Sequence, residues 1–310
     1  GPLFRATLFG LDKDENILLL VMHHIVSDGW SMGVLYRELS SLYESFSQSK
    51  APSLPEPPIQ YVDYAVWQRE YLAGGIIEAE LEYWKKQLAG MPRSLTFPGD
   101  SDRPAIPSRQ AARQSFSLSK SLSDALRALG RRGEATLFMT LLAAFYVWLR
   151  RYTGQDDIVI GSPVAGRNRA EIEGLIGFFV NTLLLRADLS GDITFRELLS
   201  QVRTMSLEAL TNQNVPYEKL VAALPRRSAR LDALVQAAFA FQTGTAPLRL
   251  NGLTTSRMNI KPGAAKLELT LFMWDEAEGL SGALEYDTGL FNDRAVATMI
   301  EDFQKLLEAI

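Results

Sequence analysis

The stretch VMHHIVSDGWSM, residues 21–32, joins an apolar run to a helical pattern and contains His23 and His24, the two histidines of the 310-residue chain. The run NILLLVMHH is apolar almost throughout, as in a strand that is covered on both faces of its sheet. After the DG pair, apolar residues recur at helical spacing. The sequence therefore predicts a buried strand that ends in the two histidines, followed by a turn and a helix.

The histidine pair is compatible with several kinds of site. Because adjacent strand residues point to opposite faces, only one imidazole can face a given cavity. The sequence has no third histidine and no cysteine, and a pair on opposite faces cannot converge on one ion, which argues against a metal site. A Ser-His-Asp hydrolase fits by residue type, but the sequence has no GxSxG elbow. The plain alternative is two core histidines at the end of a strand.

Composition narrows the class of protein. The net charge is −4 and no basic run occurs, which argues against nucleic-acid binding. The absence of cysteine excludes disulfides and a cysteine nucleophile, and it suits the reducing cytoplasm that we expect as the location. No signal-peptide pattern opens the sequence, and the most apolar segment, residues 136–149, is too short to cross a bilayer. This segment predicts a buried helix instead.

Helical and strand patterns mix along the chain, which predicts an α/β fold with a mixed sheet. A segment rich in proline and aspartate, FPGDSDRPAIPSR, indicates a linker between two lobes. Strand patterns occupy residues 4–11, 16–24, 113–119, 157–166, 177–188, 234–242, 267–275 and 280–287, and helical patterns occupy residues 31–46, 61–72, 78–90, 120–133, 136–149, 194–213 and 293–310.

Four motifs in order carry a family resemblance. HHIVSDG matches the HHxxxDG signature of condensation domains of nonribosomal peptide synthetases, and acyl-CoA acyltransferases of the chloramphenicol acetyltransferase-like fold carry shorter relatives of it. YVDYAVWQREYL resembles the family's Y-x-D-[YF]-A-x-W-Q-R segment, IGFFVNTLLLR its [IV]-G-x-F-V-N-T…R segment, and NQNVPYEKLV its H-Q-D-x-P-[FY]-E segment. The whole chain thus resembles a condensation domain. MHHIVSDGWSMGVL with FFVNT looks most like the subtype that joins an L-configured donor to an L-configured acceptor.

The resemblance implies two chloramphenicol acetyltransferase-like lobes with mixed sheets flanked by helices. We expect residues 1–97 to belong to the N-terminal lobe, 98–107 to link the lobes, and 108–310 to form the C-terminal lobe. The family's R-H-x-x-L-R-x-x-F motif is not among the 22 residues before His23, so we expect a fragment with an incomplete first lobe that is itself poorly active or inactive. In the family, Asp28 would pair with an arginine of that region, which predicts an unpartnered carboxylate here.

The implied reaction is amide formation. An aminoacyl amine on a downstream peptidyl carrier domain attacks the acyl or peptidyl thioester on an upstream one. Phosphopantetheine arms deliver both substrates, no cofactor is bound to the chain, and an adenylation domain follows in the same polypeptide. Neither nucleic acid nor membrane is an expected partner. The alternatives are a stand-alone acyl-CoA-dependent acyltransferase of the same fold and a non-catalytic carrier-docking fragment.

The resemblance also assigns candidate site residues. His24 is expected to face a channel at the junction of the lobes, where neutral imidazole suits positioning of the amine and relay of a proton. His23, Asp28 and Gly29 are expected to support it; Gly29 fits a tight turn and Ser31 a helix N-cap. Channel or architectural roles are expected for Tyr61, Asp63, Trp67, Arg69, Asn181 and Arg186.

Overall fold

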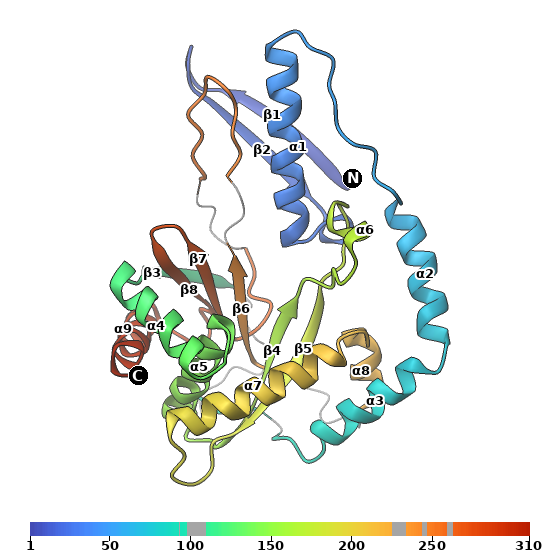
Figure 1. The fold of residues 1–310 in the computed structure, drawn as a ribbon. Helices are drawn as coiled ribbons and strands as arrows, with labels where there is room; N and C mark the ends of the chain where they lie inside the picture. The colour runs from blue at the N-terminus through green and yellow to red at the C-terminus, as the bar shows by residue number, and fades with distance from the viewer. Residues whose placement is uncertain (93, 98–109, 225–233, 244–246, 259–262) are drawn as a thin grey trace. The chain divides into compact units, whose positions relative to one another are not determined.

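The structure is a computed structural model that describes the chain except residues 93, 98–109, 225–233, 244–246 and 259–262 (Figure 1). The described chain forms two compact units. The first comprises residues 1–74, 165–181 and 245–257, and the second comprises residues 75–164, 182–244 and 258–310. In this grouping, residues 165–181 and 245–257 belong to the first unit and residues 75–92 and 94–97 belong to the second, while the lobes expected at 1–97 and 108–310 stay a prediction. The predicted linker, 98–107, lies outside the described residues.

The first unit begins with an antiparallel pair of strands, β1 (Phe4–Gly10) and β2 (Asn16–Met22), in a register that pairs Phe4 with Met22. Every residue of β1 is exposed, and β2 has a mixture of exposed and half-buried positions. The prediction of a strand covered on both faces is therefore wrong in the described structure. The physical reason is that the described sheet has two strands, so its apolar side chains are not enclosed by further layers.

Two helices and a short turn of helix complete the described core of the first unit. They are α1 (Gly29–Ser47), α2 (Tyr61–Ala73) and α6 (Ala170–Glu173). A buried cluster joins α2 to the 165–181 segment, and its members are Tyr64, Ile172, Leu175 and Phe179. Tyr61 and Trp67 pack against this cluster from α2. Aromatic and aliphatic burial thus holds together segments that are more than a hundred residues apart in the sequence.

The second unit is built on a six-stranded mixed sheet with the order β3-β8-β7-β6-β4-β5. Its strands are β3 (Ala111–Ser117), β4 (Asp157–Val164), β5 (Asn181–Asp188), β6 (Ala237–Thr243), β7 (Leu269–Glu276) and β8 (Gly279–Asp287). β8 runs antiparallel to both β3 and β7, whereas β6 runs parallel to β4 and β7. The predicted mixed α/β sheet is confirmed. The strand predicted at 177–188 starts only at Asn181, so the first four of those residues form a loop.

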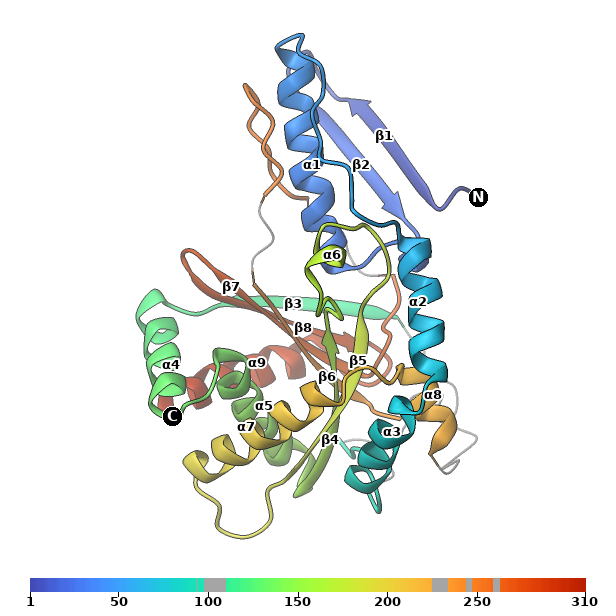
Figure 2. The same ribbon diagram turned by 45° about the vertical axis from the view of Figure 1, so that its right-hand side comes forward.

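Helices cover this sheet, and Figure 2 shows α4, α5 and α9 gathered along it. The described helices of the second unit are α3 (Ile76–Gln87), α4 (Lys120–Arg132), α5 (Leu137–Thr153), α7 (Phe195–Thr211), α8 (Tyr217–Ala223) and α9 (Asp293–Ala309). α5 is the predicted apolar helix, with ten buried residues, a Thr136 N-cap and Gly154 in the left-handed conformation at its end. The Trp148 indole donates a hydrogen bond to the Met299 carbonyl, which ties α5 to α9. Within the described residues, no helix combines the length and apolarity needed to cross a membrane.

Candidate functional site

The two histidines lie just beyond β2, in a tight loop between that strand and α1. His23 caps a single turn of 3-10 helix, His24–Val26, and both imidazoles are exposed. The two histidines are therefore not strand residues, and the prediction that their side chains point to opposite faces of a sheet is wrong in its basis. The N-cap of α1 is Asp28 rather than Ser31, because the Asp28 carboxylate accepts a hydrogen bond of 2.8 Å from the Ser31 backbone N–H. Gly29 is consequently the first helical residue and not a turn residue.

Backbone hydrogen bonds hold the two imidazoles in different tautomers. The Nδ1 atom of His24 lies 2.6 Å from the Ser27 carbonyl oxygen. A carbonyl can only accept, so Nδ1 carries a proton, and Nε2 of the neutral ring keeps its lone pair. His23 is the reverse case, because its Nδ1 accepts a hydrogen bond of 3.1 Å from the Ile25 N–H. Among the described residues, no hydrogen-bond partner occupies His24 Nε2, which leaves it free to accept a proton.

Asp28 is paired with Arg167, which overturns the prediction of an unpartnered carboxylate. The Arg167 guanidinium lies 3.2 Å and 3.4 Å from the two Asp28 carboxylate oxygens. Their side chains are only 1% and 2% exposed. The residues are 139 positions apart in the sequence. The arginine that the family resemblance placed upstream is thus supplied from the 165–181 segment of the same compact unit.

Arg167 holds more than the carboxylate. Its guanidinium donates to the carbonyl oxygens of Ile172 (2.5 Å) and Leu175 (2.8 Å) and lies 4.0 Å from the centre of the Phe179 ring. Burial lowers the pKa of Arg167 from its ordinary value, and the nearby Asp28 carboxylate opposes that shift. Arginine keeps its charge under such conditions, so the pair is a buried ion pair that locks the histidine loop to the 167–175 turn.

The loop 177–180 is anchored from several sides to the histidine loop and α2. The Phe179 N–H donates to Asp28 over 3.0 Å, and the Gly177 N–H donates to the Ser31 hydroxyl over 3.1 Å. The Tyr61 hydroxyl donates to the Phe178 carbonyl over 2.8 Å. These bonds fix the backbone of the FFVN motif against the helix start that follows the histidines.

Gly177 is required by a close approach. A Cβ built on it would lie 2.2 Å from the Tyr61 ring, well below any real contact distance. Burial raises the pKa of Tyr61, with the Asp28 charge acting in the same direction, so the phenol stays protonated and can donate. The motif glycine and the motif tyrosine are therefore parts of one contact.

The remaining candidates on α2 are architectural. The Asp63 carboxylate accepts a hydrogen bond of 2.8 Å from the Gln60 N–H and completes a capping box. Trp67 is half-buried, stacks on Tyr71 and lies under the Arg169 guanidinium at 4.4 Å. Arg69 is exposed.

The candidates on β5 also lie at structural positions. Asn181 is the half-buried first residue of the strand. Arg186 makes a two-pronged ion pair with Asp157 over 2.8 Å and 2.7 Å and donates to the carbonyl oxygens of Gln87 and Ala89. It thus fastens β5 to β4 and to the end of α3 within the second unit.

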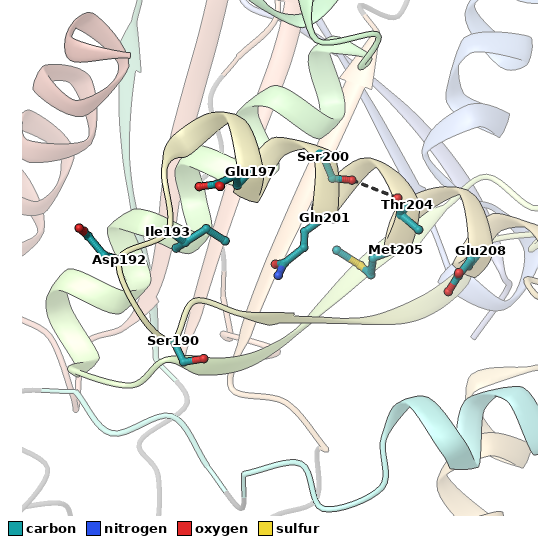
Figure 3. A pocket seen from close by; sticks show the side chains of 9 residues that line it. All are labelled: Ser190, Asp192, Ile193, Glu197, Ser200, Gln201, Thr204, Met205 and Glu208. Carbon is teal, nitrogen blue, oxygen red and sulfur yellow. Dashed lines mark hydrogen bonds between the residues drawn. The ribbon is translucent and has the colours of Figure 1, made fainter.

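A cavity of about 720 Å³ forms a groove along α7 in the second unit (Figure 3). It contains no residue of the histidine loop. Its lining is mostly polar and comprises Ser190, Asp192, Ile193, Glu197, Ser200, Gln201, Thr204, Met205 and Glu208. No metal-binding cluster of three or more histidine, cysteine or acidic residues occurs in the described parts of the chain. The histidine loop therefore remains the candidate site.

Arg167 is the residue of the candidate site that the sequence prediction missed. It lies in the short run AGRNR, just after β4, and no local periodicity marks it. A buried carboxylate without a partner is energetically costly. The expected burial of Asp28 was therefore the available signal that an arginine or lysine elsewhere in the chain must pair with it.

Comparison with known proteins gives a consistent result. The family model "Condensation domain" matches residues 1–310. The chain is 46% identical over 316 residues to one of the linear gramicidin synthase proteins of Brevibacillus parabrevis, a match that covers 100% of the chain and 6% of that protein. The solved X-domain from teicoplanin biosynthesis superimposes with a TM-score of 0.88 at 28% identity, over 99% of this chain and 72% of that one. The four-domain nonribosomal peptide synthetase AB3403 gives a TM-score of 0.80 at 26% identity, over 100% of this chain and 24% of that one.

Proposed function

The chain belongs to the condensation-domain family, and from that premise we propose that it forms peptide bonds within a nonribosomal peptide synthetase, with His24 at the reacting centre. The observation that carries the proposal is the hydrogen bond from His24 Nδ1 to the Ser27 carbonyl, because it leaves Nε2 as a proton acceptor. The chain spans only about 6% of the length of the gramicidin synthase protein that it matches. That the chain works as part of a whole synthetase is thus also a proposal.

In the proposed reaction, the α-amine of an aminoacyl thioester attacks the carbonyl carbon of an acyl or peptidyl thioester. A C–N bond forms, the C–S bond breaks, and the sulfur leaves as a thiol after it takes up a proton. Free α-amines have pKa values near 7.7–8.0, so a neutral amine at pH 7 costs only about 1 kcal/mol. A general base is therefore of little benefit before the attack.

His24 serves the later proton movement and the alignment of the amine. After attack, the nitrogen of the tetrahedral intermediate is strongly acidic, and a positioned base contributes roughly 10²–10⁴-fold. Nε2 accepts this proton and returns it to the leaving sulfur. Holding two tethered reactants together contributes about 7–11 kcal/mol, which exceeds the base term. His24 thus acts first as a hydrogen-bond acceptor that orients the amine.

The Asp28–Arg167 pair supports His24 without touching the substrates. Asp28 caps α1, and Arg167 ties that cap to the 167–175 turn, so the short loop that carries His24 is fixed at its C-terminal side. Because an error of about 1 Å in the position of a catalytic group costs about 10²-fold in rate, such anchoring is part of the proposed activity.

The proposed partners are an upstream and a downstream peptidyl carrier domain, whose phosphopantetheine arms bring the thioesters, and an adenylation domain in the same polypeptide. The similarity to a four-domain synthetase supports that setting. The sequence MHHIVSDGWSMGVL with FFVNT favours an L-configured donor and an L-configured acceptor.

The test is single-turnover dipeptide formation between loaded carrier domains, in the polypeptide that carries this sequence. We expect His24→Ala to lose at least about 10²-fold in rate, in line with loss of a positioned base. His23→Ala is the companion variant: its Nδ1 caps the turn that carries His24, so we expect it to lower the melting temperature rather than the rate of the folded protein, and a melting curve is recorded for each variant. Equal rates in His24→Ala and the parent would refute the proposal, and formation of product from acyl-CoA in place of the donor carrier would favour the acyltransferase alternative.

A further inference from the structure

Phe178 occupies an unusual position beside the histidine loop. Its neighbours Gly177 and Phe179 are buried, whereas Phe178 is 38% exposed. The corresponding place in the motif [IV]-G-x-F-V-N-T is the variable one. The Phe178 side chain is therefore only partly enclosed and contributes little to the buried core of its unit.

The backbone of Phe178 is held more firmly than its exposure suggests. The Tyr61 hydroxyl donates to its carbonyl oxygen, and the next residue, Phe179, donates through its N–H to the Asp28 carboxylate. Both anchors belong to the same compact unit as His24. The Phe178 ring is consequently presented from a fixed point.

That ring meets His24 edge to face. The two ring centroids are 5.1 Å apart and the planes make an angle of 82°. This is the T-shaped arrangement that aromatic pairs prefer. Among the described residues, the His24 ring makes one hydrogen bond, from Nδ1 to the Ser27 carbonyl. A single hydrogen bond leaves the ring free to tilt about the axis of that bond.

We propose that Phe178 is a positioning residue that holds the His24 imidazole so that Nε2 keeps one direction. The inference rests on the proposed role of His24. The hydrogen bond to Ser27 selects the tautomer, and the Phe178 ring selects the tilt. Rotation of an imidazole about χ2 has a broad, roughly two-fold profile, so a second contact is needed to define it. Loss of an aromatic pair of this kind corresponds to about a 2- to 12-fold loss in rate.

The variants separate a ring contact from a general loss of apolar surface. Phe178→Leu removes the ring and keeps an apolar side chain, while Phe178→Tyr keeps the ring and is expected to restore the parent rate. Phe46→Leu is the matched control: Phe46 is 65% exposed and lies at the far end of α1, about 25 Å along the helix axis from the histidine loop.

Two measurements are made on the polypeptide that carries this sequence. The first is single-turnover dipeptide formation between loaded carrier domains at saturating concentration. The second is NMR of the imidazole protons and nitrogens, in which the His23 and His24 resonances are assigned by their loss in His23→Ala and His24→Ala. We expect Phe178→Leu to lose about 2- to 12-fold in rate and to move the His24 resonances but not those of His23. Phe46→Leu should change neither, and the Phe178 and Phe46 variants should melt at the parent temperature.

The double variant Phe178→Leu, His24→Ala shows whether Phe178 acts through His24. We expect its rate to equal that of His24→Ala alone. A further loss in the double variant, or a parent-like rate and parent-like His24 resonances in Phe178→Leu, overturns the positioning role. If His24→Ala itself keeps the parent rate, the proposed function fails first and the positioning role falls with it. A slow His24→Ala beside a fully active Phe178→Leu removes only the role of Phe178.

Discussion

Replacement of Arg167 by methionine should destabilise the first unit by about 3–5 kcal/mol, because it strands a buried carboxylate. The Asp28 and Arg167 side chains are 2% and 1% exposed, and the closest N–O distance is 3.2 Å. At an effective dielectric constant of about 20, two unit charges at this distance attract by about 5 kcal/mol. Methionine also removes the donors to the Ile172 and Leu175 carbonyls, and each buried acceptor left unpaired costs about 1–3 kcal/mol. Relaxation of the structure and water penetration reduce the sum of these terms, so we expect the free energy of unfolding to fall by about 3–5 kcal/mol.

The assay is urea unfolding read by hydrogen exchange at the amides of residues 29–47 and 170–181, which report the first unit. The double variant Asp28→Asn, Arg167→Met should lose less than the sum of the two single variants, with a coupling of at least about 2 kcal/mol. Arg150→Met is the control, because the Arg150–Asp156 pair has a closer contact of 2.6 Å but side chains that are 38% and 46% exposed. Both residues lie in the second unit, so exchange in this variant is read at the amides of residues 137–153. Its loss should stay below about 1 kcal/mol. A loss of that same size in Arg167→Met would refute the reasoning.

Three further predictions concern the surroundings of the site and the second unit. Gly177→Ala should cost about 1–3 kcal/mol in urea unfolding, since its Cβ would lie 2.2 Å from the Tyr61 ring, and an unchanged midpoint would contradict this. Tyr61→Phe should cost about 0.5–1.5 kcal/mol and speed exchange of the amides in residues 177–181 through loss of the bond to the Phe178 carbonyl; unchanged exchange would argue that the bond is not formed. In the second unit, hydrogen bonds from Thr194 lower the pKa of Glu197. A carboxyl whose pKa is lower in the folded state stabilises the fold above its unfolded pKa and loses that contribution as the pH falls below about 4.5. Amide hydrogen exchange in α7 should therefore speed up less on acidification in Glu197→Gln than in the parent. An equal acceleration in both proteins would contradict the cap.

Long periodic segments were predictable because their local pattern and their burial agree. Residues 136–149 are apolar on every side, and the structure buries ten residues of α5, the helix that they begin. The closing pattern at 293–310 matches α9, which is capped by Asn292 and buries one stripe including Val296 and Phe303. In such elements the sequence periodicity reports the same neighbours that the fold provides.

The histidine loop was predicted less well because its structure depends on distant partners. An apolar run reads as a strand up to His24, but β2 stops at Met22 and a 3-10 turn follows. The partner of Asp28 lies 139 residues away, and no periodicity connects two such positions. The loop before Asn181 is apolar like a strand, but its backbone is held by the Asp28 carboxylate and the Tyr61 hydroxyl instead of a strand ladder.

The spacing of the histidine motif follows from the hydrogen bonds that the structure makes. His24 must reach the Ser27 carbonyl with Nδ1, which a single 3-10 turn allows because residues three apart eclipse one another. Asp28 must follow at once, because its carboxylate has to cap α1 and meet Arg167. One residue more between His24 and Asp28 would break either the tautomer-setting bond or the cap, and one residue fewer would leave no room for the turn. The interval in HHxxxDG is therefore the backbone path that links His24 to the ion pair that anchors its loop, and the residues inside that interval can vary as long as this path is kept.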